Sequence, residues 1–233
     1  MFSPLLIRRV ILAACFLYPF RLSAAKIIEQ PQEGYLLNAP RVISQDKALP
    51  VLVCLPGWGV KAKNDINLWA FPADKRGFLL IELDIDYAAI NSQKQVEALF
   101  ARIEKIIQQL ASNYNIDKNK LFLAGTSAGA MMAISLALLY PGRFKAMGII
   151  SGARLGFGAG TRLKNAKGQL FYFYHGKKDK SIPIAEFYAT QKKLRANGAI
   201  IEFKVIEEGE HTLPSGSYKE VVDLLYQLAE LMP

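Results

Sequence analysis

Cysteine and histidine are the scarcest reactive residues in this chain of 233 residues, which has two of each. Cys15 lies in an apolar run near the N-terminus, and Cys54 lies in a second apolar run further on. Structural metal sites usually take four ligands, most of them cysteine or histidine, at short local spacings. With only His175 and His211 beside these two separated cysteines, the sequence predicts no metal site.

The N-terminus has the three-part pattern of a secretory signal peptide. Arg8 and Arg9 precede a short apolar run, and the small residues Ser23-Ala24-Ala25 follow it. This pattern predicts that residues 1–25 are a signal peptide, cleaved after Ala25, and that the product is secreted or periplasmic. The apolar run is shorter than a membrane-spanning helix requires, so we expect no stable membrane anchor. The alternative is a retained helix close to the membrane.

Positive charge is in modest excess. The whole chain has 29 basic and 20 acidic side chains and a formal charge of +9, and loss of the three arginines of the leader leaves 29 − 3 = 26 basic residues and +6. The lysines are scattered and do not form a stripe with aromatic residues, so nucleic-acid binding is not indicated. Cleavage also removes Cys15, so that Cys54 is expected to be a single, inert, buried thiol.

No internal repeat, low-complexity tract or long polar linker divides the rest of the chain. With 52% hydrophobic and 21% charged residues, residues 26–233 are expected to form a single domain with a sizeable core. Predicted strands alternate with predicted helices, which indicates an α/β fold with a mostly parallel sheet and helices on both faces. The strands are expected near residues 50–56, 77–86, 120–124, 145–151, 169–174 and 200–206, and the helices near residues 92–113, 130–139, 184–197 and 216–231.

Three stretches lack a clear pattern. Residues 27–50 contain three prolines and are expected to give one or two edge strands. Residues 60–76 are expected to form a polar loop or a short helix, and residues 152–168, which are rich in glycine, a loop. Because no long insertion interrupts the alternation, we expect no cap domain over the sheet.

The pentapeptide Gly125-Thr126-Ser127-Ala128-Gly129 is the most informative stretch. It follows an apolar run expected to be a strand and precedes one expected to be a buried helix. A strand, a sharp turn with serine at its apex and a helix are the setting of a nucleophile elbow. Glycines are needed two positions before and after the serine, because neighbouring backbone passes close by. The alternative is that Ser127 is an ordinary helix N-cap beside packing glycines.

A serine hydroxyl needs a base, which is usually a histidine oriented by a carboxylate. His211 lies in a loop after the last predicted strand, from which a side chain can reach the carboxyl edge of the sheet. Asp179 follows the preceding strand and is the acid candidate, whereas Asp84 and Asp86 follow an earlier strand and are expected to be structural. His175 is expected to pack at the end of its strand. The acidic residues beside His211 are too close to it in sequence to be favoured orienters: Glu207, Glu208 and Glu210.

The order of serine, acid and histidine is that of α/β-hydrolases. Four stretches carry this resemblance over residues 50–231: Leu55-Pro56-Gly57-Trp58, Asn115-Ile116-Asp117 leading to the pentapeptide, His175-Gly176-x-x-Asp179-x-x-Ile182-Pro183, and Gly209-Glu210-His211. The chain resembles small lidless esterases of this superfamily, of the phospholipase/carboxylesterase, dienelactone-hydrolase and polyhydroxybutyrate-depolymerase/feruloyl-esterase-like types. Such enzymes often have His-Gly before the oxyanion loop, where this chain has Pro56-Gly57.

The resemblance implies a serine hydrolase that cleaves a small-molecule or polymeric carboxylic ester through an acyl-enzyme, with no cofactor. Its implied catalytic residues are Ser127, Asp179 and His211, and its implied oxyanion donors are the backbone N–H groups of Trp58 and Ala128. Two alternatives stay open. One is a peptidase resembling prolyl-oligopeptidase-like enzymes, against which the missing gating domain counts. The other is a catalytically silent binding protein of the same fold, against which the complete set of three side chains counts.

Several aromatic residues have two interpretations, as the lining of a substrate pocket or as ordinary packing: Trp58, Trp69, Phe71 and Phe157. The sequence predicts no oligomeric state.

Overall fold

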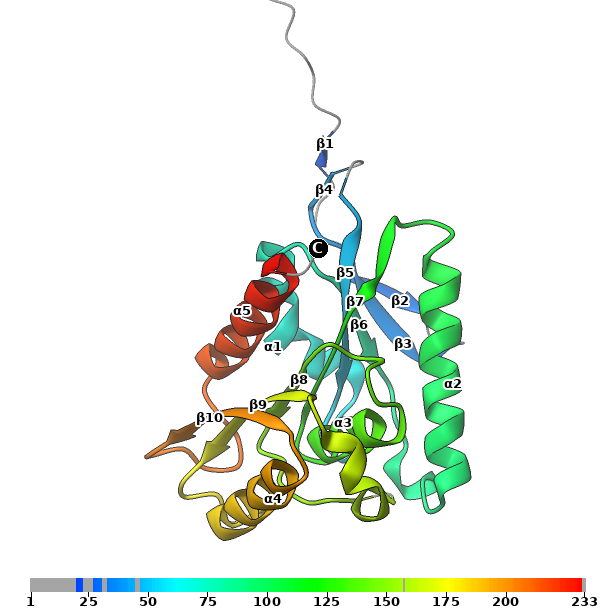
Figure 1. The fold of residues 1–233 in the computed structure, drawn as a ribbon. Helices are drawn as coiled ribbons and strands as arrows, with labels where there is room; N and C mark the ends of the chain where they lie inside the picture. Colours follow the sequence, from blue (N-terminus) through cyan, green and yellow to red (C-terminus); the bar gives the residue numbers. More distant parts are fainter. Residues whose placement is uncertain (1–19, 23–26, 31–32, 45–46, 157, 232–233) are drawn as a thin grey trace, which may run out of the picture.

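The computed structural model describes residues 20–22, 27–30, 33–44, 47–156 and 158–231. Most of the expected signal peptide and its cleavage point lie outside these ranges, as does Phe157. Within them, a central eight-stranded sheet is covered by helices on both faces (Figure 1). The mostly parallel α/β architecture predicted from the sequence is confirmed, and no cap domain is present among the described residues.

The strands of the main sheet follow the order β10-β9-β8-β7-β5-β6-β3-β2. Their bounds are β2 Ile27–Gln30, β3 Tyr35–Asn38, β5 Leu49–Leu55, β6 Leu79–Leu83, β7 Ile116–Thr126, β8 Met147–Ile150, β9 Leu170–Gly176 and β10 Ile200–Ile206. Neighbours from β6 to β10 are parallel, and β3 runs antiparallel to both β2 and β6. The carboxyl ends of the parallel strands therefore meet at one edge.

Two layers of helices enclose the sheet (Figure 1). The helices α1 (Ala62–Lys75) and α5 (Ser215–Leu231) pack on one face, while α2 (Gln93–Leu110), α3 (Ala128–Leu139) and α4 (Ile184–Ala196) pack on the other. The two short 3₁₀ helices are η1 (Tyr87–Ala89) and η2 (Ala159–Ala166). Each face thus has its own apolar core.

The burial of these elements follows from their sequences. Every residue of β5 is buried, as expected for an apolar strand in the middle of a parallel sheet. The helix α2 buries the stripe of apolar residues that recurs at helical spacing. It begins with a capping box between Ser92 and Gln95. The helix α3 is apolar nearly all round and is buried against β7, β8 and β5.

The three stretches without a clear pattern are more regular than the sequence indicates. Residues 60–76 contain a full helix, α1, in which Trp69 is buried despite the internal Pro72. Residues 27–50 contribute the antiparallel strands β2 and β3, which require no helical crossover. They also contain β4 (Val42–Ser44), which pairs with β1 (Phe20–Leu22), a segment inside the expected leader. The glycine-rich stretch after β8 contains η2.

Candidate active site

Ser127 stands at the turn between β7 and α3, in a backbone conformation that side chains rarely adopt. Its φ is 54° and its ψ is −114°, a combination that costs on the order of 1–3 kcal/mol. A Cβ atom on Gly125 would collide with the backbone of Gly129, and one on Gly129 would collide with the carbonyl of Leu55. Ser127 occupies the N-cap position of α3, and its carbonyl accepts from the N–H of Met131 (3.1 Å), but its hydroxyl makes no capping hydrogen bond, so the side chain does not serve as an ordinary helix cap.

The side chains of Ser127, His211 and Asp179 form one continuous line of hydrogen bonds. Nε2 of His211 lies 2.9 Å from Oγ of Ser127, and Nδ1 lies 2.8 Å from Oδ2 of Asp179. The serine comes from the end of β7, the aspartate from the loop after β9, and the histidine from the loop after β10. The structure thus brings together, at the carboxyl edge of the sheet, the three side chains that the sequence singles out.

The Asp179 side chain is fully buried, yet its oxygens are well supplied with donors. Oδ1 accepts hydrogen bonds from the backbone N–H groups of Ser181 (2.8 Å) and Ile182 (2.9 Å), and Oδ2 faces His211. A buried carboxylate is stable only when such partners replace its lost water. The carboxylate is therefore held in one orientation toward the imidazole.

Two glycines allow the loops that carry the base and the acid to touch. A Cβ atom on Gly176 would collide with the backbone carbonyls of Gly209 and Glu210. The N–H of Lys178 donates to the carbonyl of Gly209 (2.8 Å), which ties the two loops together. Gly209 itself has no room for a Cβ beside Ile206. The His-Gly and Gly-Glu-His motifs are thus two sides of one backbone contact that places His211.

His175 is part of the frame of the site and does not reach Ser127. It is fully buried and stacks on Phe187 with ring centroids 4.9 Å apart. Its Nε2–H donates to the carbonyl of Ile182 (2.8 Å) and lies 3.5 Å from Oδ2 of Asp179. Burial lowers the pKa of His175, which favours a neutral ring. The prediction that this histidine packs at its strand end is confirmed.

The oxyanion side of the site is a tight turn after β5. The N–H of Val60 donates to the carbonyl of Gly57 (3.1 Å), and Gly59 has a φ of +72°, which favours glycine at this position of the turn. A Cβ on Gly57 would lie 3.6 Å from that of Ser127, so the turn adjoins the serine. The N–H of Ala128 is the first of α3 and has no partner within the helix. Trp58 thus follows a residue that adjoins the serine, and Ala128 follows the serine itself.

Tyr87 supports this turn and has no signal in the sequence. Its buried hydroxyl donates to the carbonyl of Pro56 (2.8 Å), and its ring stacks with Trp58 at a centroid distance of 6.0 Å. The contact joins η1 to the loop after β5, two segments that are distant in sequence. The Trp58 ring is 63% exposed and is held from behind by Tyr87.

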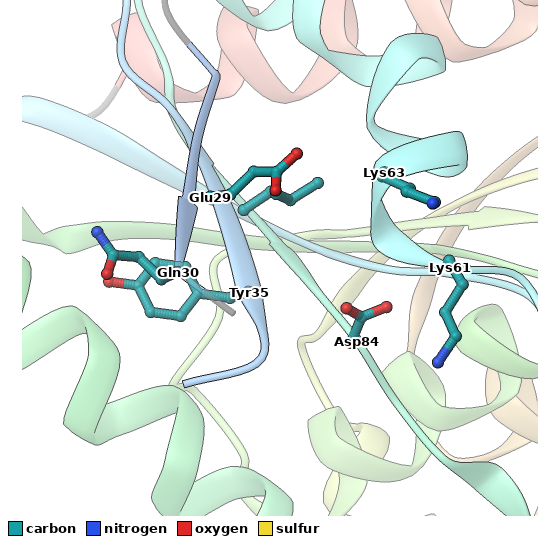
Figure 2. A pocket seen from close by; sticks show the side chains of 7 residues that line it. Glu29, Gln30, Tyr35, Lys61, Lys63 and Asp84 are labelled. Carbon is teal, nitrogen blue, oxygen red and sulfur yellow. The ribbon is translucent and has the colours of Figure 1, made fainter. Parts of the chain in front are cut away.

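Two cavities share Lys61 and Asp84 in their linings, and one of them is also lined by Trp58. The one beside Trp58 has a volume of about 380 Å³, and it also reaches Asp86. The other has a volume of about 250 Å³. Figure 2 shows the second cavity, with Glu29 on β2 facing the start of α1. Since both walls carry charged groups, these spaces suit polar ligands better than long alkyl chains.

The other acidic candidates have structural roles, as predicted. Asp84 accepts a hydrogen bond from the N–H of Ala62 (2.9 Å), at the start of α1, and Asp86 accepts one from the N–H of Ala88 (3.1 Å) in η1. The glutamates before His211 pair with lysines of the neighbouring loop: Glu207 with Lys177 and Glu208 with Lys178.

The remaining predictions on single residues have mixed outcomes. Trp58 lines a cavity, whereas Trp69 lies in the core and Phe71 is 61% exposed on α1. Cys54 is buried in β5, and burial raises the pKa of its thiol well above the usual value, which disfavours the reactive thiolate.

Among the described residues, no group of three cysteine, histidine or acidic side chains could hold a metal ion. No described helix is long and apolar enough to span a membrane.

The chain has clear relatives among esterases. Its sequence matches the phospholipase/carboxylesterase family over residues 79–229, which is more than half of its length. A segment of 54 residues is 39% identical to an acetylxylan esterase of Coprinopsis cinerea, covering 23% of this chain and 14% of that protein.

Solved structures of esterases and serine hydrolases share the fold. A thermostable esterase has a TM-score of 0.65 at 21% identity, covering 89% of this chain and 62% of its own. A carboxylesterase of Bacillus cereus has a TM-score of 0.64 at 19% identity, covering 84% and 93%. FphF, a fluorophosphonate-binding serine hydrolase of Staphylococcus aureus, has a TM-score of 0.63 at 14% identity, covering 82% and 91%. At these identities the likeness is one of fold. With the family match, it makes the chain a hydrolase of the phospholipase/carboxylesterase family with the α/β-hydrolase fold.

Proposed function

We propose that the protein hydrolyses carboxylic esters through an acyl-enzyme formed on Ser127. The observation that supports this most is the hydrogen-bonded line from Oγ of Ser127 through His211 to Asp179. A hydroxyl in this position can pass its proton to Nε2 as it attacks an ester carbonyl. Asp179 holds Nδ1 as the donor and stabilises the imidazolium that forms.

The tetrahedral intermediate needs donors for its negative oxygen. We assign this role to the backbone N–H groups of Trp58, which follows the glycine that adjoins Ser127, and of Ala128, the first residue of α3. Donors of this kind are worth about 3–4 kcal/mol each in the transition state. His211 then returns its proton to the leaving alcohol, and water attacks the acyl-enzyme by the same route in reverse. No step draws on a cofactor.

The substrate is proposed to be a short or polar ester, either small or part of a polymer. The cavity beside Trp58 carries Lys61, Asp84 and Asp86, and burying such groups under a long alkyl chain would cost their hydration. The local similarity to an acetylxylan esterase points the same way, toward a short acyl group. The phospholipase/carboxylesterase family match and the esterases among the solved structures favour esters over peptides.

We also propose that residues 1–25 are removed after secretion and that residues 26–233 act as a single domain. This rests on the basic, apolar and small-residue order of the N-terminus.

The first test is hydrolysis of p-nitrophenyl acetate and butyrate by the protein and by Ser127→Ala. Loss of a triad serine lowers kcat by about a millionfold, so we expect the variant to fall to the background rate. The exposed Ser112, replaced by alanine, is the matched control and is expected to keep full activity. Fluorophosphonate labelling of the protein, but not of Ser127→Ala, would identify the nucleophile independently.

Two results would contradict the proposal. Activity that survives in Ser127→Ala would place the nucleophile elsewhere, and an inactive, unlabelled protein would favour a silent binding protein. Faster cleavage of p-nitrophenyl amides than of the matched esters would favour the peptidase.

A further inference from the structure

Among the strands of the described residues, β10 pairs only with β9 and forms one outer edge of the main sheet (Figure 1). The N–H of Ile200 donates to the carbonyl of Gln169 at the start of β9 (2.9 Å). Backbone groups of successive residues in a strand point in opposite directions. Every second residue from Ile200 therefore faces β9, and the residues between them direct N–H and C=O groups to the open edge: Ile201, Phe203 and Val205.

This edge also gathers exposed apolar side chains. Ile200 is 56% exposed, Phe203 46% and Tyr188, on the adjacent helix α4, 48%. Phe203 and Tyr188 contact each other edge to face, with ring centroids 6.3 Å apart. An unpaired strand edge with such side chains is a template for pairing with another strand.

The sequence of β10, Ile-Ile-Glu-Phe-Lys-Val-Ile, complements itself under a two-fold rotation about Phe203. In antiparallel pairing centred there, Glu202 of one copy lies opposite Lys204 of the other. On the opposite face of the sheet, apolar residues meet apolar residues: Phe203 lies opposite Phe203, and Ile201 opposite Val205.

The backbone register agrees with the side-chain register. The centred pairing sets Phe203 against its own copy and Ile201 against Val205, and these are the residues whose N–H and C=O groups face the open edge. Each such pair can exchange both hydrogen bonds. Glu202 and Lys204 then form the non-hydrogen-bonded pairs, in which side chains lie closest together. A shift of the pairing by one residue would lose both the backbone hydrogen bonds at the open edge and the opposition of Glu202 to Lys204.

We propose that two copies of this chain associate through β10, with two-fold symmetry about Phe203, and join their sheets into one. A two-fold interface is self-complementary by definition, and the charge order of β10 meets that condition. Glu202 takes part in no ion pair among the described residues, so it is available to a second copy. Lys204 contacts Glu220 (2.7 Å) with an exposed ammonium, which can bridge both acids.

Arg195 competes for this edge within one copy. Its guanidinium donates to the carbonyl of Ile201 (3.2 Å) and lies over the ring of Phe203, 5.3 Å from its centroid. A second strand would displace this exposed side chain. Charged residues on an edge strand can also serve to prevent pairing, and the two interpretations predict opposite oligomeric states.

The decisive experiment is analytical ultracentrifugation of the full chain with the single variants Glu202→Lys and Lys204→Glu. We expect the protein to be a dimer and each variant to dissociate, because each brings like charges together at both cross-strand pairs. The dissociation constant should rise on the order of tenfold or more. Glu202→Lys has lysine at both positions 202 and 204, and Lys204→Glu has glutamate at both. In a mixture of the two variants each lysine lies opposite a glutamate, so the heterodimer should form with a dissociation constant similar to that of the parent dimer. Arg195→Ala should dimerise more tightly.

The controls separate this interface from loss of folding or activity. Lys105→Glu changes the same charge on the exposed side of α2, on the other side of the molecule, and should leave the dimer intact. Circular dichroism and ester hydrolysis should be unchanged in all variants, since β10 ends before the loop that carries His211. A monomeric parent protein, a dimer that survives Glu202→Lys, or variants that do not associate on mixing would each overturn the proposal.

Discussion

Asp179 and Glu82 are both carboxyl groups buried in this molecule, and their surroundings differ in every respect. Asp179 has two backbone N–H donors and an imidazole within hydrogen-bonding distance. Glu82, in the middle of β6, has no N–H or O–H donor among the described residues. The charged groups that act on it are Asp65 on α1 and Asp84, and Asp65 accepts a hydrogen bond from the indole of Trp69 (3.0 Å).

The difference shows two ways in which the fold accommodates a buried carboxyl group. Burial first, and then the nearby charge of Asp65, raise the pKa of Glu82 well above its usual value. The raised pKa favours the protonated form of Glu82, a group that can itself donate a hydrogen bond, whereas the oxygens of Asp179 face backbone N–H groups and an imidazole. The active site thus has a buried carboxyl group that is supplied with hydrogen-bond donors, Asp179. The core between the sheet and α1 has one without such donors, Glu82.

The largest effect should come from Asp179→Asn, which turns the carboxylate into an amide. The N–H groups of Ser181 and Ile182 would keep the amide oxygen, and the NH2 group would then face Nδ1 of His211 and favour the wrong tautomer, so kcat should fall by about a thousandfold or more. Glu82→Gln is the matched control, because it makes the same chemical change in the other buried group and should keep kcat within a few fold. Equal losses in the two variants, measured with p-nitrophenyl acetate, would show that both act only through the fold.

A smaller effect is expected from His175→Phe, which keeps the stack on Phe187 but removes one donor from the frame around Asp179. The carbonyl of Ile182 would be left buried without its hydrogen bond, at a cost of about 1–3 kcal/mol in the free energy of unfolding. Urea denaturation measures this loss. We expect kcat to fall much less than in Asp179→Asn; a comparable fall would make His175 part of the catalytic line.

The smallest effect per pH unit concerns the pH dependence of stability in Glu82→Gln. Because the pKa of Glu82 is raised by folding, its contribution is complete below the pKa of an unfolded glutamate, about 4.3, and is lost as pH rises toward the folded value. The parent protein should lose up to about 1.4 kcal/mol per pH unit from this group across that interval. The variant, followed by urea denaturation from pH 5 to pH 9, should show a flatter curve.

The predictable parts of the fold are those where local sequence and tertiary structure agree. The apolar runs that became β5, β7 and β10, and the stripe of α2, need no distant information. The serine turn was predictable because Gly125 and Gly129 mark a close approach of backbone. His211 and Asp179 could be proposed because parallel strands bring their ends to one edge.

What the sequence did not indicate depends on contacts between distant segments. The helix α1 was uncertain because Pro72 interrupts it and because the burial of Trp69 relies on its edge-to-face packing against Tyr218 of α5. Tyr87 has no motif, since its role arises only where η1 meets the loop after β5. Glu82 lies in an apolar run, and its raised pKa depends in part on Asp65, which lies on another element, α1.

Asp179 and His211 of the proposed triad lie in the loops after β9 and β10, the two strands at one edge of the sheet. Ser127 follows β7, which lies nearer the centre. In a single copy, before any pairing with a second chain, β10 is an edge strand, and an edge strand exchanges its amide hydrogens and frays at lower free energy than a central one. A brief opening of β10 would therefore carry His211 away from Ser127 while the rest of the sheet stays folded. Loss of activity on heating or in denaturant would then report the detachment of one strand, ahead of the melting of the domain.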